Sequence, residues 1–288
     1  MQDSFSYCEQ LVREADKDRF LAGLFAPADR RMALMALYAF NVEIARAREH
    51  VHEALAGEVR LQWWRDALND PPPDEARANP VADALIDTVV RCKLPVETLL
   101  RLIDARTFDL YDDPMPSQTE LETYAQRTSS ALIELAAAIL GGSELDLGET
   151  AIHAGKAYAI TGLLRAFPLH AARGQVYIPR DVLDRHGVSR EEIVAGKATD
   201  ALRAALAEIR LQVRQHLAEL DEWRSLVPPE ASPAFLPVAL VPPCSRAWSG
   251  VTTILSSSLS CPNGAGNGSC GVPRGGIFRG RNRVTQSC

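Results

Sequence analysis

Residues 39–49 read A-F-N-V-E-I-A-R-A-R-E, and the stretch around them decides the fold. Pro27 and Asp29 suit the start of a helix, because proline fits a first helical turn and an aspartate side chain accepts hydrogen bonds from free backbone amides. Apolar residues then recur at helical spacing, which predicts a buried helix over 29–50. One face of that helix carries Tyr38, Val42, Ala45 and Glu49.

Helical patterns also fill most of the chain on either side of this stretch. They cover 3–20, 52–69, 81–92, 95–112, 117–140, 144–167, 199–226 and 229–241. Three consecutive prolines follow the second of these ranges, so residues 71–80 are expected to form a polar loop. Only residues 176–178 suggest an extended segment. The sequence therefore predicts an all-α, single-domain helical bundle.

Composition limits the classes of function. The 288 residues contain no apolar run of about 18 residues, so no transmembrane segment is expected. The first residues, M-Q-D-S-F-S-Y-C-E, lack the basic and apolar regions of a signal peptide, and we expect a cytoplasmic protein. Acidic residues number 37 against 31 basic ones, and five of the basic ones are arginines after residue 242. A body this acidic excludes a nucleic-acid partner.

The character of the chain changes at residue 242. Residues 242–288 are rich in serine, glycine and cysteine and contain no acid and no lysine. The plain interpretation is a disordered tail. The alternative is a shifted reading frame, because codons permitted for P-C-S-R-A-W-S-G-V-T-T-I-L at 243–255 can encode V-L-S-R-M-E-R-R-D-Y-D-P two bases later. Codons for 260–270 can likewise encode L-P-Q-W-R-R-Q-W-Q-L.

We therefore expect a helical domain over 1–241 and a disordered, frameshifted tail over 242–288, with apolar surface left uncovered by a missing helix. The tail holds four of the six cysteines, without a C-x-x-C pair and without a histidine, so it predicts no zinc site. Cys8 and Cys92 lie in helical patterns and are expected to be buried thiols.

Three motifs carry a resemblance to a known family. They are A-L-Y-A-F at 36–40, W-W-R at 63–65 and G-Q-V-Y-I-P at 174–179, and they resemble the squalene/phytoene synthase family over about residues 3–241. The resemblance implies an isoprenoid-synthase-like helical bundle around a central cavity. It also implies an enzyme that joins two isoprenyl diphosphates head to head, with magnesium held by two aspartate-rich motifs.

This chain departs from the family at those aspartates. The first motif, D-D-x-x-D, aligns on Ala45, Arg46 and Glu49. The carboxylate and amide positions of the second motif align on Ala159, Gly162, Ala166 and His170. The positions that keep the family pattern are Arg165, Arg173, Gly174, Tyr177 and Pro179.

The loss has a direct chemical consequence. Magnesium needs hard oxygen ligands, and Glu49 alone offers too few for a metal cluster. The surviving arginines could instead place positive charge against a leaving diphosphate; they are Arg46, Arg48, Arg165 and Arg173.

Most candidates also have a purely structural interpretation. Glu49 is most simply the partner of a facing arginine. Arg165 is either a buried arginine paired with an acid or an anion-binding residue. His170 stands near a helix end, where it could interact with the helix dipole rather than bind a metal. Tyr124 aligns with a tyrosine of the family's cavity, although tyrosines are common in helices.

Two further groups are interpreted as structural. Trp63 and Trp64 are expected in the core rather than in the wall of a prenyl pocket. Asp109, Asp112 and Asp113 precede Pro114 near a helix end, and we expect a solvated cap there rather than a metal site.

The motif N-V-E-I-A-R-x-R-E is similar to a branch of the family found among assembly factors of mitochondrial respiratory complex I. The leading hypothesis is a synthase-fold protein that has lost metal-dependent prenyl transfer and acts as a binding or assembly protein, without a cofactor. The alternative is an active, magnesium-dependent head-to-head prenyltransferase whose catalytic residues would be Glu49, Arg165 and Arg173. A third hypothesis is a carrier that binds an isoprenoid or lipid in the old cavity.

The expected ligand-binding residues are Tyr38, Arg46, Glu49, Tyr124, Arg165, Arg173 and Tyr177, with no metal ligand. The expected partner is a protein, an isoprenoid diphosphate or a lipid, and peripheral contact at the inner face of a membrane would be compatible with a cytoplasmic location.

Overall fold

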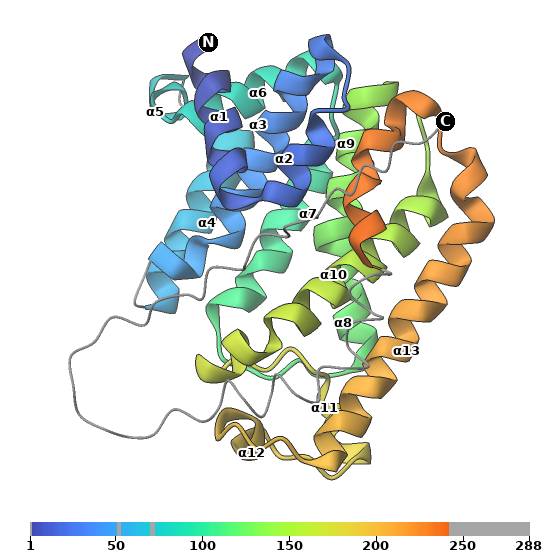
Figure 1. The fold of residues 1–288 in the computed structure, drawn as a ribbon. Helices are drawn as coiled ribbons and strands as arrows, with labels where there is room; N and C mark the ends of the chain where they lie inside the picture. Colours follow the sequence, from blue (N-terminus) through green and yellow to red (C-terminus); the bar gives the residue numbers. More distant parts are fainter. Residues whose placement is uncertain (1, 51–52, 70–72, 242–288) are drawn as a thin grey trace, which may run out of the picture.

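The computed structural model describes residues 2–50, 53–69 and 73–241, and within these ranges it contains helices and no strand (Figure 1). The prediction of an all-α bundle is confirmed. The expected tail, 242–288, lies outside the described residues. No helix in the described ranges is long and apolar enough to cross a membrane.

The α-helices are α1 (Gln2–Ala15), α2 (Lys17–Gly23), α3 (Ala28–Ala45), α4 (Ala54–Asn69), α5 (Pro73–Ala78), α6 (Pro80–Cys92), α7 (Val96–Arg106), α8 (Gln118–Ala125), α9 (Ala131–Gly141), α10 (Gly148–Ala172), α11 (Arg180–Arg185), α12 (Arg190–Val194) and α13 (Asp200–Trp223). Short turns of tighter or wider helix are η1 (Ala47–His50), η2 (Thr107–Leu110), η3 (Gln126–Ser130), η4 (Arg224–Leu226), η5 (Pro229–Ala234) and η6 (Leu236–Leu240).

Helix α3 forms the centre of the bundle, as the sequence predicts. Its residues from Ala33 to Val42 are all buried, because α1, α6 and α9 pack around it. Phe40 of α3 meets Trp64 of α4 edge to face, with ring centroids 5.1 Å apart. Trp64 is fully buried and Trp63 is partly buried, so both tryptophans belong to the core, as expected. The α-helix ends at Ala45, and η1 continues the predicted range to residue 50.

Several predicted boundaries are wrong, for local reasons. The range 3–20 is broken at Asp16, whose carboxylate accepts a hydrogen bond from the Arg19 amide at 3.1 Å and starts α2 as a new helix. The loop predicted for 71–80 contains the short helix α5. The helix predicted for 95–112 ends at Arg106 and tightens into η2.

Two further differences involve prolines. Helix α10 continues past Pro168 to Ala172, beyond the predicted end at 167, because Phe167 and Ala171 remain buried on its inner face. The helix predicted for 229–241 is instead two 3₁₀ segments, η5 and η6. Proline recurs there at 229, 233 and 237, and each proline removes an amide donor that an α-helix would use.

The arrangement that positions the site involves α8, η3, α9, α10 and α13. Helices α10 and α13 lie side by side, and η3 joins α8 to α9 against the face of α10 (Figure 1). Gly155 of α10 makes that contact possible, because a Cβ atom there would lie 2.3 Å from the backbone of Ser130 in η3.

Candidate functional site

A cavity of about 630 Å³ opens where α3, η2, α8 and α10 converge. We call it the central cavity. Its wall is largely polar and carries both signs of charge. Its lining residues are Ala45, Arg48, Glu49, Arg106, Asp109, Tyr124, Leu163, His170, Arg173, Gln175 and Tyr177.

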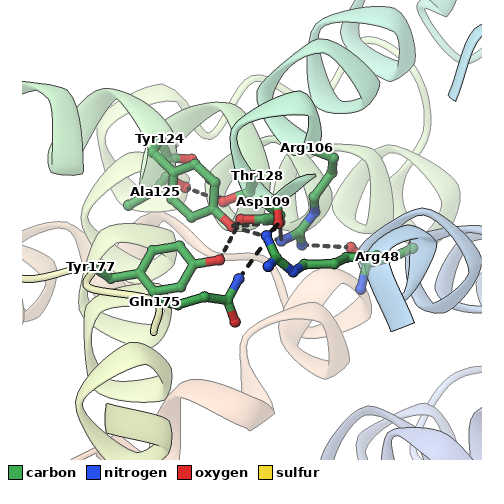
Figure 2. Close-up of polar contacts among 9 residues, drawn as sticks. Arg48, Arg106, Asp109, Tyr124, Ala125, Thr128, Gln175 and Tyr177 are labelled. Atoms are coloured by element: carbon green, nitrogen blue, oxygen red, sulfur yellow. Dashed lines mark hydrogen bonds and ion pairs between the residues drawn. The ribbon is translucent and has the colours of Figure 1, made fainter. Parts of the chain in front are cut away.

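Asp109 of η2 lies at the centre of a hydrogen-bond network in this wall (Figure 2). Its carboxylate accepts a hydrogen bond from the Tyr177 hydroxyl at 2.8 Å and from the Tyr124 hydroxyl at 2.9 Å. Arg106 forms an ion pair with the same carboxylate at 3.1 Å and donates to the Tyr124 oxygen at 2.8 Å. The side chains of Asp109 and Arg106 are only 13% and 15% exposed. We call these four residues the Asp109 network.

The backbone around Asp109 is also held by side chains. Arg48 donates to the Leu110 carbonyl at 2.9 Å and forms an ion pair with Asp112 at 2.7 Å. Gln175 donates to the Asp109 carbonyl at 3.5 Å. These contacts tie η1 and the segment after α10 to η2, so the carboxylate is fixed from several elements.

The surroundings shift the pKa values of the two tyrosines and of Arg106 in the network. Burial raises the pKa of the Tyr177 hydroxyl, and the adjacent Asp109 carboxylate raises it further. The pKa of Tyr124 is raised for the same two reasons, although Arg106 opposes the rise. Burial alone would lower the pKa of Arg106, but its contacts with Tyr124 and Asp109 raise it. Both phenols therefore stay neutral and donate hydrogen bonds to Asp109.

Local structure explains how the two tyrosines reach Asp109. Ser117 caps α8 by accepting a hydrogen bond from the Glu120 amide at 3.2 Å, and Tyr124 follows on that helix. Tyr177 lies in the irregular segment after α10. Met115 pairs with this segment, because its amide donates to Val176 at 3.2 Å and its carbonyl accepts from Arg180 at 2.9 Å.

His170 lies in the last turn of α10, at the cavity wall. Its ring packs against Tyr177 with centroids 4.8 Å apart. Burial lowers the pKa of His170, and the nearby Arg173 lowers it further against the opposing effect of Asp109. A neutral imidazole is thus favoured beside the tyrosine.

A second cavity of about 340 Å³ adjoins the first, sharing Ala45, Arg106, Tyr124, Leu163 and His170 with it. Arg46 and the ion pair of Asp16 with Arg19 also line it. Four of the positions that align with the family's carboxylates and amides line these cavities as alanine or glycine. They are Ala45, Ala159, Gly162 and Ala166.

These residues do not fit a magnesium cluster. Magnesium is bound through oxygen atoms, and alanine and glycine side chains have none. Glu49 is half exposed, and its nearest charged partners are Arg173 at 3.5 Å and Arg46 at 3.7 Å. Within residues 2–50, 53–69 and 73–241 no group of three or more His, Cys, Asp or Glu side chains is placed to hold a metal ion.

The structure brings most of the predicted ligand-binding residues together. Glu49, Tyr124, Arg173 and Tyr177 line the central cavity, and Arg46 lines the adjoining one. The pairing of Glu49 with arginine is the simple interpretation expected from the sequence.

Two predicted residues lie elsewhere. Tyr38 is fully buried beside Arg19, whose guanidinium carbon lies 5.8 Å from the tyrosine ring. Arg165 is not a buried arginine, because its side chain is 51% exposed and pairs with Asp18 at 3.7 Å. Neither residue lines the central cavity.

The main residue missed from the sequence is Asp109. The expectation of a solvated cap is wrong for this residue, although the side chain of its neighbour Asp112 is half exposed. Arg106 and Gln175 were missed with it. The available signal was the Arg106-x-x-Asp109 spacing at a helix end, which allows an i,i+3 ion pair.

The cysteines in the described ranges have structural settings. Cys8 is fully buried, and desolvation with help from Asp83 raises the pKa of its thiol to about 12. Cys92 is only partly buried. The expectation of a buried thiol is therefore confirmed for Cys8 and wrong for Cys92.

Comparisons with known proteins show what the chain is similar to in sequence. The sequence model of the squalene/phytoene synthase family matches residues 12–246. The rat (Rattus norvegicus) protein named NADH dehydrogenase (ubiquinone) complex I, assembly factor 6 is 40% identical over 234 residues, covering 81% of this chain and 70% of that protein. The presqualene diphosphate synthase of Sinorhizobium fredii is 31% identical over 205 residues, covering 68% and 70% of the two chains.

A solved structure shares the fold. The squalene synthase HpnC from Alicyclobacillus acidocaldarius superposes with a TM-score of 0.74 at 23% identity, covering 88% of this chain and 95% of that one. The all-helical architecture around the central cavity is therefore that of the squalene synthases. The chain belongs to the squalene/phytoene synthase family. Within that family, its sequence is similar both to assembly factors of respiratory complex I and to prenyl-transferring enzymes.

Proposed function

We propose that this chain is a family member that has lost metal-dependent prenyl transfer and acts as a binding protein in the assembly of a respiratory NADH dehydrogenase. The observation that carries the proposal is the set of small side chains at Ala45, Ala159, Gly162 and Ala166. They occupy the cavity wall where the family resemblance implies metal-binding groups. Without oxygen ligands there, the cavity wall has no group to hold a magnesium ion. The ion therefore cannot link the protein to a diphosphate.

The Asp109 network supports the same conclusion. It holds the most buried carboxylate of the cavity wall, and its oxygens already accept hydrogen bonds from Tyr124, Tyr177 and Arg106. Recruiting Asp109 to a metal would break an ion pair with a buried arginine, which is costly. The network therefore stabilises the cavity wall. The 40% identity to a protein named as a complex I assembly factor supports a role carried by a protein partner.

The catalytic half of the proposal can be tested with purified protein. The full chain is incubated with farnesyl or geranylgeranyl diphosphate and magnesium, with and without NADPH. Released pyrophosphate and extracted hydrocarbon are measured, with an active squalene synthase as the positive control. We expect no turnover. Sustained magnesium-dependent release of pyrophosphate would contradict the proposal. Diphosphate binding without turnover would point to a carrier that keeps the old pocket.

The assembly half is tested in the organism that carries the gene. Deleting the gene should lower NADH:quinone oxidoreductase activity in membranes and leave succinate oxidation unchanged, and the reintroduced gene should restore it. Unchanged NADH oxidation in the deletion strain would contradict the assembly role.

A second candidate is head-to-head prenyl transfer with arginines in place of the metal cluster. Arg48 and Arg173 at the central cavity and the 31% identity to a presqualene diphosphate synthase favour it. This candidate expects Arg173→Ala to abolish turnover. Arg185→Ala is the matched control, because Arg185 is as exposed as Arg173 and lies outside that cavity.

The location is part of the proposal. We infer a cytoplasmic protein that contacts the inner face of a membrane. Exposed apolar side chains at the turn between α2 and α3 support this contact, and Phe25 is 74% exposed there beside Leu21 and Leu24. Cell fractionation tests it: Phe25→Ser should move protein from the membrane fraction to the soluble fraction.

A further inference from the structure

A groove of about 540 Å³ lies between the end of α13 and the two 3₁₀ segments η5 and η6. We call it the C-terminal groove. Its two charged lining residues, Asp221 and Arg224, form an ion pair with each other at 3.7 Å, so their charges cancel. The rest of its wall is mainly apolar and includes Leu217, Leu220, Val227, Phe235, Leu236 and Val238.

Two arginines lie on the face of α13 that lines this groove. Arg210 and Arg214 precede Leu217 and Asp221 in a run whose members are four, three and four residues apart. Residues at that spacing share one face of an α-helix. Leu217 and Asp221 line the groove, so the two arginines continue the same face toward the start of α13. We call Arg210 and Arg214 the arginine stripe.

The charge of the arginine stripe is not compensated. Within the part of the chain that the structure describes, neither guanidinium has an acidic partner. Arg210 and Arg214 are four residues apart, and like charges at that spacing on a helix repel each other. Burial and the charge of Arg214 both lower the pKa of Arg210. The neighbours three or four residues away on α13 include no acid; they are Leu206, Ala207, Leu211, Val213, Leu217 and Ala218.

The chemistry of this surface defines what would bind to it. A carboxylate beside the arginine stripe would remove the repulsion, and the printed residues 242–288 contain neither Asp nor Glu to supply one. A lipid bilayer presents a flat surface and does not reach the wall of a concave groove. An amphipathic helix does, because its apolar side chains enter a groove of this kind and remove both surfaces from water. An acidic flank on such a helix would complement the arginines.

We propose that the C-terminal groove and the arginine stripe together form the docking site for an acidic amphipathic helix of a protein partner. Apolar side chains of the partner helix fill the groove, and its carboxylates pair with Arg210 and Arg214. The inference rests on the proposed function, because it gives the chemistry of the partner that an assembly protein for a respiratory NADH dehydrogenase would bind.

The first test uses the deletion strain described above. Reintroduced Arg210→Glu/Arg214→Glu should restore about a tenth of the NADH:quinone oxidoreductase activity that the wild-type gene restores, or less, because like charges across an interface weaken binding strongly. Arg127→Glu/Arg180→Glu is the matched control, since it changes the net charge equally at exposed arginines outside the groove. Equal restoration by the two variants would overturn the docking site and leave the assembly role standing. Failure of the wild-type gene would instead contradict the assembly role.

A second variant separates docking from folding. Arg210→Gln/Arg214→Gln removes the positive charges without adding acids. The purified variant should keep the Tm of the wild-type protein or exceed it, because the substitutions remove a repulsion and break no ion pair. In the deletion strain it should still restore less activity than the wild-type gene. A clearly lower Tm would show that the arginines stabilise the fold, and it would overturn the proposal.

Cross-linking tests the chemistry of the partner, whatever the outcome in the deletion strain. Leu236, which lines the groove and is 38% exposed, is replaced in cells by the photoreactive residue p-benzoylphenylalanine, and the cross-linked peptide is sequenced by mass spectrometry. We expect a segment with an apolar helical face flanked by acids. Arginines in place of those acids should restore the cross-link that Arg210→Glu/Arg214→Glu abolishes. No cross-link, a cross-link to lipid or to residues 242–288, or no such rescue would overturn the proposal.

Discussion

Asp109 joins three elements through a single carboxylate, since Arg106 comes from α7, Tyr124 from α8 and Tyr177 from the segment after α10. Each donor is largely buried, so water cannot replace the carboxylate as hydrogen-bond acceptor without a large cost in free energy. The main contribution of Asp109 to stability is therefore that it keeps the buried guanidinium of Arg106 paired.

The variant Asp109→Asn tests this dependence. The amide keeps the shape of the side chain but leaves the charge of Arg106 uncompensated, so we expect the free energy of unfolding to fall by about 3 kcal/mol or more. Urea unfolding at neutral pH measures the loss. Asp112→Asn is the control, because Asp112 is half exposed and its pair with Arg48 should contribute about 1 kcal/mol or less. Similar losses in the two variants would contradict the role of Asp109.

A second residue-scale feature joins α10 to α13. The Nδ1 atoms of His153 and His216 lie 3.0 Å apart, so one ring must donate and the other accept. Burial lowers the pKa of His216 to about 4, and the neighbouring Lys156 and His153 add to this against the opposing effect of Glu122. Native His216 is therefore neutral at a pH where the same side chain in the unfolded chain is charged.

The pH dependence follows from that difference. As pH falls below about 6.5, the unfolded chain binds a proton at His216 that the native protein does not bind, so the free energy of unfolding decreases until pH approaches about 4. His216→Gln should remove this contribution. We expect the difference in unfolding free energy between wild type and variant to shrink between pH 7.5 and 4.5. If the free energy of unfolding changed with pH in the same way for the two proteins, this would contradict the lowered pKa of His216.

The residues of the site were predictable only where they belong to motifs. Glu49, Tyr124, Arg173 and Tyr177 could be placed at the cavity because short patterns surround them. Asp109 could not, because its side chain turns inward only when α7 tightens into η2, and this depends on tertiary contacts from Arg48 and Gln175. Tyr38 illustrates the opposite error. It shares a helical face with Glu49 by spacing, but α3 ends before Glu49 is reached.

At the scale of elements, two interior glycines of α10 have opposite roles. Gly155 allows η3 to approach, whereas an added Cβ at Gly162 would meet no atom within 4 Å. A helix-interior glycine with free space around it is simply a weak helix former. The two positions therefore form a matched pair within one helix.

Substituting each glycine by alanine separates the effect of close packing from the effect of helix propensity. Gly155→Ala should lower Tm markedly, because overpacking against a backbone costs about 1–3 kcal/mol or more. Gly162→Ala should raise the free energy of unfolding by up to about 1 kcal/mol, since alanine favours the helix. Thermal unfolding monitored by circular dichroism measures both. A harmless Gly155→Ala would mean that η3 and α10 are not in close contact.

Element boundaries show where periodicity stops being informative. Helix existence was predicted well for α3, α4, α6 and α13, whose apolar positions repeat over several turns. The ends were less predictable, because capping by Asp16 and the spacing of prolines at 229, 233 and 237 act on the backbone rather than on the apolar pattern. Local hydrogen-bond chemistry therefore set most of the boundaries that were wrong.

At the scale of the whole molecule, the bundle should keep its stability without a metal. The described residues place no cluster of metal-binding side chains, and the small residues of the cavity wall offer no oxygen atoms. We expect the same Tm with EDTA and with excess magnesium, because a ligand raises Tm only if it binds the native state. A magnesium-dependent rise in Tm, absent with potassium chloride at equal ionic strength, would contradict this expectation.

The overall architecture was the most predictable level. Helical periodicity, the lack of strand patterns and three family-like motifs together indicated a helical bundle around a cavity, and the described residues form one. The shape of the cavity wall was not predictable to the same degree, because it depends on how α10 and the segment after it fold back toward η2.

The small side chains along α3 and α10 have one more consequence, which concerns protein engineering. Ala45, Ala159, Gly162 and Ala166 line open volume inside a fold whose stability rests on other residues. New side chains at these positions would therefore extend into free space rather than displace the core. The chain offers a scaffold in which recognition of a chosen small molecule can be designed into the cavity, one helix position at a time.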